Sequence, residues 1–418
     1  MLSEQSFNEG WLSQLKEHLK LQRYSPQATQ RRMAVADRFL AYLDRRAVPI
    51  QKAGPSNVSL YLQNELKLFR HRHGHAPWSS MADWQRSHTA GIEMLLQLVH
   101  GQWPPVPQPS TPLEEFHRDL CGQYDKWMHD LRGLALETRS SRCAEARRLL
   151  AWLGDRGSQQ ELLGITVADI DAYMTFRAQL QRRSSVREVA TSLRNFLRYL
   201  HVSRRTTADL STSVVGPTLY AFESIPSALD AEDVKKVVQI ARRDHSTEGL
   251  RDYAILMLLS SYGLRAGEIT SMRLEDVDWH REVLRIRHSK TGDRSELPLL
   301  SAVGNAILNY LQKGRPTTDA RTIFIVHHAP YGPFHSGSSL YWLVRNRITA
   351  AGVEGQGRLG PHAFRHARAI SLLRAAVSAK EIGDILGHRS AESTAVYLKL
   401  ATADLRAVAL EIPRSVNV

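Results

Sequence analysis

Apolar residues recur at helical spacing along most of the chain. Between residues 1 and 104 the spacing of three or four positions is shown by Leu15, Leu19, Val35, Phe39, Leu40 and Leu43. Such spacing is typical of amphipathic helices. The same pattern returns between residues 113 and 205. Each stretch is therefore predicted to form a small bundle of about four helices.

Two segments interrupt this pattern and divide the chain. Residues 103–112 contain five prolines, which exclude a helix interior or a central strand and favour an extended spacer. Residues 205–226 are rich in Thr, Ser, Gly and Pro and have no clear period. The predicted domains are residues 1–104, 113–205 and 227–418.

The first two domains resemble each other in three places that follow the same order. The paired segments are Phe39 to Arg46 with Leu149 to Arg156, Val58 to Leu62 with Ile170 to Met174, and Met94 to His100 with Asn195 to His201. The first domain has extra residues around His71 to Trp84. We predict a duplication, and the alternative is chance similarity between two amphipathic bundles.

The third domain mixes helices with short strands. A helix is expected to start at Asp230, and a buried helix from Arg251 to Tyr262 should end at Gly263. Residues 283–288 and 294–299 alternate around the turn 289–293 and predict a β-hairpin. Residues 322–326 predict a further strand. The predicted fold class is mainly α with a small β-sheet (α+β) in this domain.

The overall charge narrows the range of partners. The chain has 418 residues, a formal net charge of +13 and a pI near 9.8, which favour a nucleic acid as partner. Its two cysteines cannot build a disulfide framework, so we expect a reducing cytoplasm. The start lacks a secretory signal, and the most apolar run, Tyr253 to Tyr262, is too short to span a membrane.

Arginines gather on the helices of both amino-terminal domains. The first has Arg23, Arg31, Arg32, Arg45 and Arg46, and the second set is denser. Exposed arginines usually form a solvated face, but each phosphate that they neutralise releases a counterion and adds affinity. The arginines that we predict to bind DNA are Arg139, Arg142, Arg182, Arg183, Arg187 and Arg194.

Four short patterns follow one another in the third domain. They are Arg265-Ala-Gly-Glu268 after Tyr262-Gly-Leu, Lys290 in the hairpin turn, His362-Ala-Phe-Arg365, and Leu386-Gly-His388 followed by Tyr397. Each pattern alone is more often structural than catalytic. Their ordered combination is much more specific.

This order resembles the signature of the tyrosine recombinases, the phage integrase family, over residues 227–410. Phe364 stands where the family often has leucine, which exchanges one apolar residue for another. Residues 113–205 resemble the family's core-binding domain, so the resemblance implies a C-shaped clamp around DNA. Residues 1–104 do not resemble the small arm-binding domain of phage integrases, which leaves their target open.

The resemblance implies a role for each residue of the signature. Tyr397 would attack the DNA phosphate and form a 3′-phosphotyrosine. Arg265 and Arg365 suit the added charge on the non-bridging oxygens, because a guanidinium can bind two oxygens at once. His362 and His388 would donate hydrogen bonds and help manage the tyrosine proton. Lys290 would be the general acid for the departing 5′-oxygen. Glu268 would orient Arg265.

We expect neither a metal ion nor a nucleotide cofactor. The sequence has no cysteine pairs, no His-Glu-x-x-His and no Gly-x-x-x-x-Gly-Lys loop. The expected partners are double-stranded DNA and further copies of the chain, with a dimer on each site and a tetramer during exchange. The tail after Tyr397 would link neighbouring subunits, and accessory recombinases or DNA-bending proteins are further candidates.

Two other functions share parts of this pattern. A topoisomerase-like enzyme would use the same chemistry without a second DNA partner. A DNA-binding factor that has lost catalysis would share the fold, but it would not need all six residues of the signature. We therefore predict a site-specific recombinase that integrates or excises a mobile element.

Overall fold

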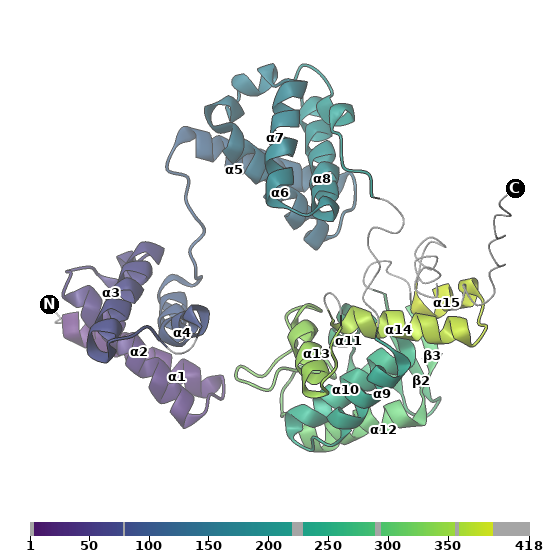
Figure 1. Cartoon of the computed structure of the whole chain (residues 1–418). Coiled ribbons are helices and arrows are strands. Elements are labelled where there is room, and N and C mark those ends of the chain that lie inside the picture. Colours follow the sequence, from purple (N-terminus) through teal and green to yellow (C-terminus); the bar gives the residue numbers. More distant parts are fainter. Residues whose placement is uncertain (1–3, 78–79, 220–228, 289–293, 356–358, 388–418) are drawn as a thin grey trace, which may run out of the picture. The chain divides into compact units, whose positions relative to one another are not determined.

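The computed structural model describes residues 4–77, 80–219, 229–288, 294–355 and 359–387. Most of these residues are helical, and one small sheet lies in the third domain (Figure 1). Lys290, His388, Tyr397 and the predicted inter-subunit tail lie outside the described residues. No helix of the described segments is long and apolar enough to cross a bilayer.

The first domain is built from four long helices. They are α1 (Glu4–Leu21), α2 (Pro26–Asp44), α3 (Pro55–His73) and α4 (Met81–His100), with the short turn η1 (Ile50–Lys52) before α3. Their core includes stacked and edge-on contacts among Phe39, Tyr42 and Tyr61. Helices α2 and α4 lie very close together, because a Cβ at Gly91 would stand only 2.2 Å from the carbonyl oxygen of Arg32.

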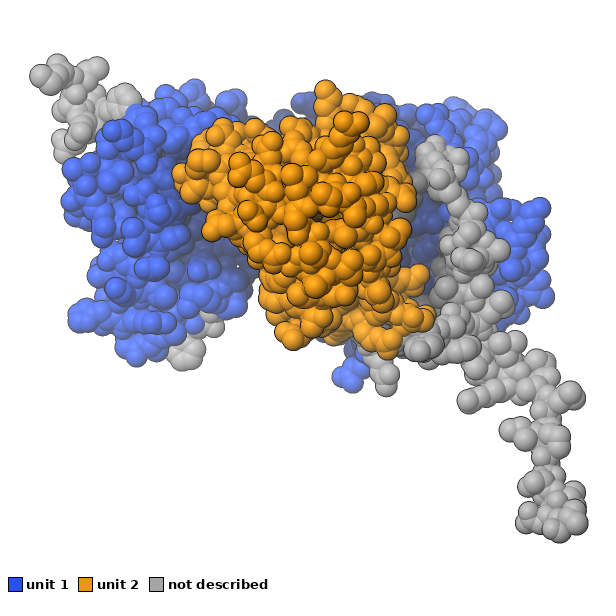
Figure 2. Space-filling view, turned by 90° about the horizontal axis from the view of Figure 1, so that it is seen from above, with its two compact units in different colours: residues 1–105, 225–418 blue, residues 106–224 orange. Residues whose placement is uncertain are grey.

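The second domain also has four long helices and its own core. They are α5 (Pro112–Asp130), α6 (Leu136–Leu153), α7 (Val167–Leu180) and α8 (Arg183–Val202), with the short turns η2 (Gly154–Gly157), η3 (Glu161–Gly164) and η4 (Leu210–Ser213). Tyr124, Tyr173 and Phe196 are fully buried at its centre. Residues 106–224 form one compact unit, and the other unit contains residues 1–105 and 225–418 (Figure 2). The duplication of the two bundles stays a prediction.

The third domain surrounds the buried helix α10. Its helices are α9 (Ala231–Arg242), α10 (Thr247–Tyr262), α11 (Ala266–Thr270), α12 (Ser301–Asn309), α13 (Ser339–Ala350), α14 (Pro361–Arg374) and α15 (Ala379–Leu386), with the turns η5 (Leu274–Asp276) and η6 (Tyr310–Gly314). The apolar residues of α10, from Leu250 to Tyr262, pack into one large core. Helices α14 and α15 enclose a smaller apolar cluster.

The sheet of the third domain is antiparallel in the order β1-β2-β3. Strands β1 (Val277–Asp278), β2 (Val283–Arg287) and β3 (Arg294–Pro298) form it, and Arg287 pairs with Arg294 at the turn end of the hairpin. The predicted hairpin is therefore confirmed, as is a mainly α fold with a small β-sheet. The predicted end of α10 at Gly263 is also confirmed, because this glycine caps the helix with φ +67°.

The strand predicted at residues 322–326 is wrong. Two isolated bridges occur there, Arg273 with Thr322 and Ile325 with Pro333. Ile323, Phe324 and Ile325 are fully buried. The apolar run therefore reflects a buried, bent segment held by isolated bridges, with no continuous ladder.

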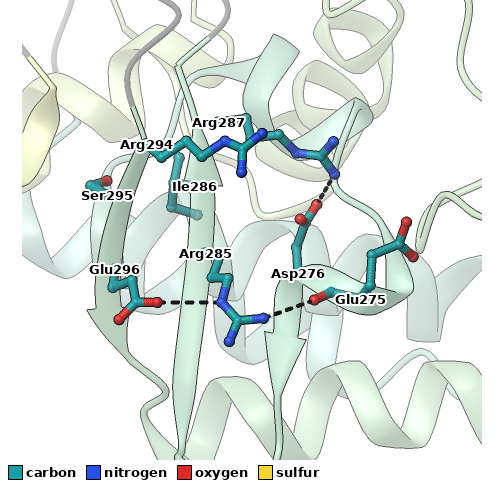
Figure 3. A pocket seen from close by; sticks show the side chains of 8 residues that line it. All are labelled: Glu275, Asp276, Arg285, Ile286, Arg287, Arg294, Ser295 and Glu296. Atoms are coloured by element: carbon teal, nitrogen blue, oxygen red, sulfur yellow. Dashed lines mark hydrogen bonds and ion pairs between the residues drawn. The ribbon is translucent and has the colours of Figure 1, made fainter.

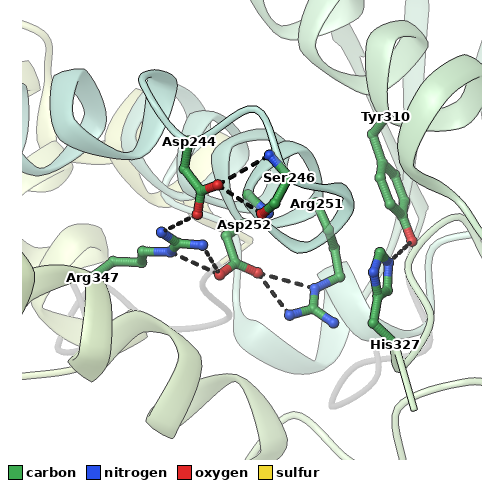
Figure 4. Close-up of polar contacts among 8 residues, drawn as sticks. Asp244, Ser246, Arg251, Asp252, Tyr310, His327 and Arg347 are labelled. Carbon is green, nitrogen blue, oxygen red and sulfur yellow. Dashed lines mark hydrogen bonds and ion pairs between the residues drawn. The ribbon is translucent and has the colours of Figure 1, made fainter. Parts of the chain in front are cut away.

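Helices α10 and α13 are joined by a buried ion network (Figure 4). Arg347 on α13 donates to Asp252 on α10 at 2.8 Å and to Asp244 before α10 at 2.7 Å, and Arg251 also pairs with Asp252. Burial raises the pKa of Asp252 despite these two arginines. The network fixes the position of α13 without contributing to the site described next.

Candidate active site

The first candidate arginine is held at the start of α11. Gly263 ends α10 in a left-handed conformation, and the chain turns so that Arg265 becomes the extended N-cap residue of α11. The carboxylate of Glu268 accepts the backbone N–H of Arg265 at 2.8 Å. The same carboxylate accepts Nη1 of Arg265 at 2.9 Å. The turn therefore fixes both the backbone and the guanidinium of Arg265.

Glu268 is a buried charge with cationic partners. Its exposed fraction is only 3%. Burial alone would raise the pKa of Glu268, but hydrogen bonds from His288 and Arg265 outweigh it and hold this pKa below its usual range. The carboxylate thus stays ionised and acts only as an acceptor.

The second candidate arginine lies on α14. Gly360 and Pro361 start this helix, His362 is exposed in its first turn, and Arg365 is buried one turn later. Arg365 donates from Nη1 to the carbonyl of Gly263 at 2.7 Å and from Nη2 to the carbonyl of Leu386 at 2.5 Å. It therefore joins the end of α10 to the end of α15.

The two arginines meet at the carboxyl end of α15. Arg365 binds the carbonyl of Leu386, and Arg265 donates from Nη2 to the next carbonyl, that of Gly387, at 2.9 Å. The last carbonyls of a helix have no partner within the helix and carry its partial negative charge, so they suit cations. Gly387 caps α15 with φ +65° and directly precedes His388 in the sequence. Residues far apart in the chain are thus brought to one helix end.

His288 belongs to this cluster and was missed in the sequence. Its Nδ1 lies 2.8 Å from Oε1 of Glu268, and its Nε2 lies 2.9 Å from Oγ of Ser295 on β3. The alternation of β2 contained the signal, because Leu284, Ile286 and His288 occupy successive inward positions. A histidine in such a position is buried and needs polar partners.

The other face of the hairpin carries paired charges. Arg285 donates to Asp278 at 2.8 Å and Arg287 to Asp276 at 2.5 Å, and both arginines line a pocket there (Figure 3). These outward arginines are therefore already balanced by carboxylates, whereas the inward face of β2 ends at His288.

His366, next to the His-x-x-Arg pattern, lies among buried groups. Its ring centroid is 6.3 Å from that of His362. Burial, with smaller contributions from His362 and Arg365, lowers the pKa of His366 to about 4. His366 is therefore neutral at pH 7, and it adds no positive charge beside Arg365.

The predicted DNA-binding arginines divide into two groups. Arg139 and Arg142 on α6 are half-buried, and Arg139 is paired with Asp125 at 2.8 Å. On α8 the arginines are exposed, and positions 183, 187, 194 and 198 fall within about 60° of one helix face at 3.6 residues per turn. Arg182 is exposed just before α8. The basic stripe of α8 is thus the stronger candidate for phosphate contacts.

The described residues contain no group of three or more His, Cys, Asp or Glu side chains that could hold a metal ion. The candidate site is instead built from two guanidiniums, a buried carboxylate and a histidine. Such a set can bind and orient a phosphate group by hydrogen bonds and charge.

Known proteins resemble this chain in both sequence and fold. The model of the phage integrase family matches residues 227–404. The putative integrase/recombinase y4gC of Sinorhizobium fredii is 56% identical over 189 residues, which cover 45% of this chain and 97% of that protein. The putative integrase/recombinase y4rF of the same organism is 33% identical over 306 residues, which cover 72% of each chain.

Solved structures share the fold at low sequence identity. A lambda integrase dimer bound to a core site is 19% identical with a TM-score of 0.52, covering 67% of this chain and 94% of that one. The XerH site-specific recombinase in a post-cleavage complex is 12% identical with a TM-score of 0.55, covering 71% and 87%.

The match to the family model and the similarity to the integrase/recombinase relatives define a DNA-recombining enzyme. The chain belongs to the phage integrase family, the tyrosine-type site-specific DNA recombinases. The family resemblance seen in the motifs and the predicted enzyme class are confirmed.

Proposed function

We propose that the enzyme cuts and rejoins DNA through a covalent bond between Tyr397 and a DNA 3′-phosphate. The phenol oxygen of Tyr397 forms a bond to phosphorus while the bond from phosphorus to the 5′-oxygen breaks. The phenol proton leaves to a nearby base, and the 5′-oxygen receives a proton from Lys290. Attack by a 5′-hydroxyl from a second duplex reverses these bonds, so no external energy source is needed.

The convergence of Arg265 and Arg365 on consecutive carbonyls carries this proposal. Both guanidiniums reach the end of α15 immediately before His388, the next residue of the signature. Preorganised cations at that point would stabilise the charge that develops on the non-bridging oxygens. His362, exposed in the first turn of α14, would donate a further hydrogen bond to the same phosphate together with His388.

We further propose that α8 contacts the DNA backbone. Its exposed arginine stripe would neutralise phosphates, with Arg187 and Arg194 near its middle. Lambda integrase has been solved as a dimer on a core site and as a tetramer on a Holliday junction. By that likeness we propose a dimer on each site and a tetramer during exchange, acting on the DNA of a mobile element in the cytoplasm.

The test is covalent trapping on a nicked duplex. The duplex carries a site selected by binding from a random library, and its nick lets the strand with the free 5′-hydroxyl diffuse away. We expect wild-type protein to form an adduct that survives denaturation. Tyr397→Phe should form none, and Arg265→Lys should lower the rate by about 10²–10³-fold, because lysine keeps the charge but loses the planar fork.

The outcomes separate the related functions. If wild-type protein binds the duplex but forms no adduct, it is a DNA-binding factor. An adduct that persists in Tyr397→Phe excludes this tyrosine as the nucleophile. An adduct without joint molecules between two duplexes indicates a topoisomerase-like enzyme, and joint molecules indicate a recombinase.

A further inference from the structure

His288 contacts both groups that hold the guanidinium of Arg265. One group is the carboxylate of Glu268, whose Oε1 accepts Nη1 of Arg265 at 2.9 Å and lies 2.8 Å from Nδ1 of His288. The other is Gly387, whose carbonyl accepts Nη2 of Arg265 at 2.9 Å. A Cβ on Gly387 would lie only 2.5 Å from Cε1 of His288, so this ring fills the space beside that glycine.

We propose that His288 is a positioning residue for Arg265, which it holds in place through Glu268 on one side and Gly387 on the other. This inference rests on the proposed role of Arg265 at the DNA phosphate. His288 therefore serves the reaction through the arginine and needs no contact with DNA.

The hydrogen bonds fix the orientation of the imidazole. An ionised carboxylate only accepts, so Nδ1 of His288 must donate to Glu268. The hydroxyl of Ser295 can donate or accept, so it can satisfy Nε2 in either protonation state. Because both ring nitrogens have partners, the ring is held in one plane against Gly387.

Loss of the His288 ring should change the protonation of Glu268 more than the stability of the fold. Glu268 faces two ionisable groups in this cluster, Arg265 at the start of its own helix and His288 directly after β2. The hydrogen bond from His288 opposes the burial of Glu268. Without that bond, the pKa of Glu268 should rise, and a protonated Glu268 would hold Arg265 less firmly.

The experiment compares two variants of His288 with a control in the full-length protein. His288→Leu keeps the bulk and removes both hydrogen bonds, whereas His288→Gln keeps an amide that can donate to Glu268. The control is His327→Leu, which removes a different partly buried histidine of the same domain, one that pairs with Tyr310 at 3.2 Å. Each protein is tested for adduct formation on the nicked duplex, for DNA affinity and for thermal unfolding.

We expect His288→Leu to slow cleavage by about 10- to 100-fold, because a misplacement of about 1 Å can cost 10²-fold. DNA affinity should change by less than about threefold, and His288→Gln should recover most of the rate. The acid limb of the cleavage profile should move to higher pH in His288→Leu and stay in place in His327→Leu. A merely structural residue would not shift this limb, since a loss of stability alone leaves the titration of Glu268 unchanged.

A double-mutant cycle tests whether the effect passes through Glu268. In a Glu268→Gln background, His288→Leu should cost clearly less than in the wild type, because the carboxylate through which it acts on Arg265 is already gone and only the contact with Gly387 is left to lose. Equal cleavage rates for wild type and His288→Leu would overturn the inference while the proposed function stands. The inference would also fail if the rate losses of His288→Leu and Glu268→Gln were fully additive and the acid limb did not move. If wild-type protein forms no adduct, the proposed function fails and the inference falls with it.

Discussion

Gly387 offers a direct test of how closely the site is packed. The change is Gly387→Ala, which adds a single methyl group at the end of α15. Two separate costs follow from the structure. The first is backbone strain, because φ is +65° and a left-handed alanine costs about 1 kcal/mol. The second is the contact with the ring of His288.

The steric cost can be worked out from the distances. The new Cβ would lie 2.5 Å from Cε1 and 2.7 Å from Nδ1 of His288, and ordinary contact begins at 3.4 Å. The ring must therefore retreat by about 0.9 Å, which stretches its 2.8 Å bond to Glu268 beyond hydrogen-bond range. Losing a bond to a charged group costs about 1.5–3 kcal/mol, so the total reaches about 2.5–4 kcal/mol.

The chain contains a matched control for the backbone term. Gly352 in the same domain has φ +63°, and a Cβ there would meet only Nζ of Lys236 at 4.0 Å. Gly352→Ala therefore carries the left-handed strain alone. Any stabilisation from a less flexible unfolded chain applies to both variants and cancels in the comparison.

The assays are thermal unfolding of the full chain and cleavage of the nicked duplex. For a domain of this size, 1 kcal/mol corresponds to a shift in Tm of about 2–4 °C. Gly352→Ala should lower Tm by about this amount and leave the cleavage rate unchanged. Gly387→Ala should lose about three times as much Tm and cleave about 10²-fold more slowly at temperatures where it is folded. Equal Tm values and equal cleavage rates for the two variants would refute the packing described for His288.

Three further predictions concern other parts of the chain. Arg347→Ala should cost about 3–5 kcal/mol in urea unfolding, because it leaves the buried Asp252 short of a cation, and Asp252→Asn in the same protein should recover part of the loss. The pKa of Asp169 is lowered to about 2, chiefly by its hydrogen bonds with Arg156. The stabilisation by ionised Asp169 is therefore complete above about pH 4 and is lost as the pH falls toward 2. In acid unfolding, Asp169→Asn should not show the loss of stability over this pH range. Replacing both Arg187 and Arg194 by Ala should weaken DNA binding and reduce the slope of log affinity against log salt by about 2, whereas Arg118→Ala, which removes an arginine already paired with Glu115 and Asp119, should leave the slope unchanged.

The local elements of the third domain could be predicted because their signals are local. Alternation and a polar turn marked the hairpin, and Gly263 marked the end of α10. The strand predicted at residues 322–326 was wrong because a short apolar run has two possible causes. A segment buried on all sides and a strand paired in a sheet are both apolar over five residues. Periodicity alone cannot separate these two cases.

The sequence predicted which residues are candidates for the site and in what order they occur, but not how they are arranged in space. Arg265 and the carbonyl of Gly387 are 122 positions apart, and only the packing of α10, α14 and α15 brings them together. The sequence marked the side chains with strong chemistry and left out His288, whose role depends on its neighbours. The DNA-binding role of Arg139 stays a prediction, and its ion pair with Asp125 could not be predicted because it depends on how α5 and α6 pack together.

In the proposed reaction, the anchoring of Arg265 would let the site hold this cation and still present it to the DNA phosphate. A guanidinium has five N–H groups, and Glu268 and Gly387 engage one on each terminal nitrogen. No described residue occupies the remaining N–H groups, and the side chain keeps 20% of its surface exposed. Because the anchors are a buried carboxylate and a helix carbonyl, the orientation is fixed in the protein alone, so the proposed reaction would need little reorganisation as charge develops on the phosphate. A lysine at this position could not bind both anchors and the phosphate at once, since the three donors of its ammonium lie at a single point.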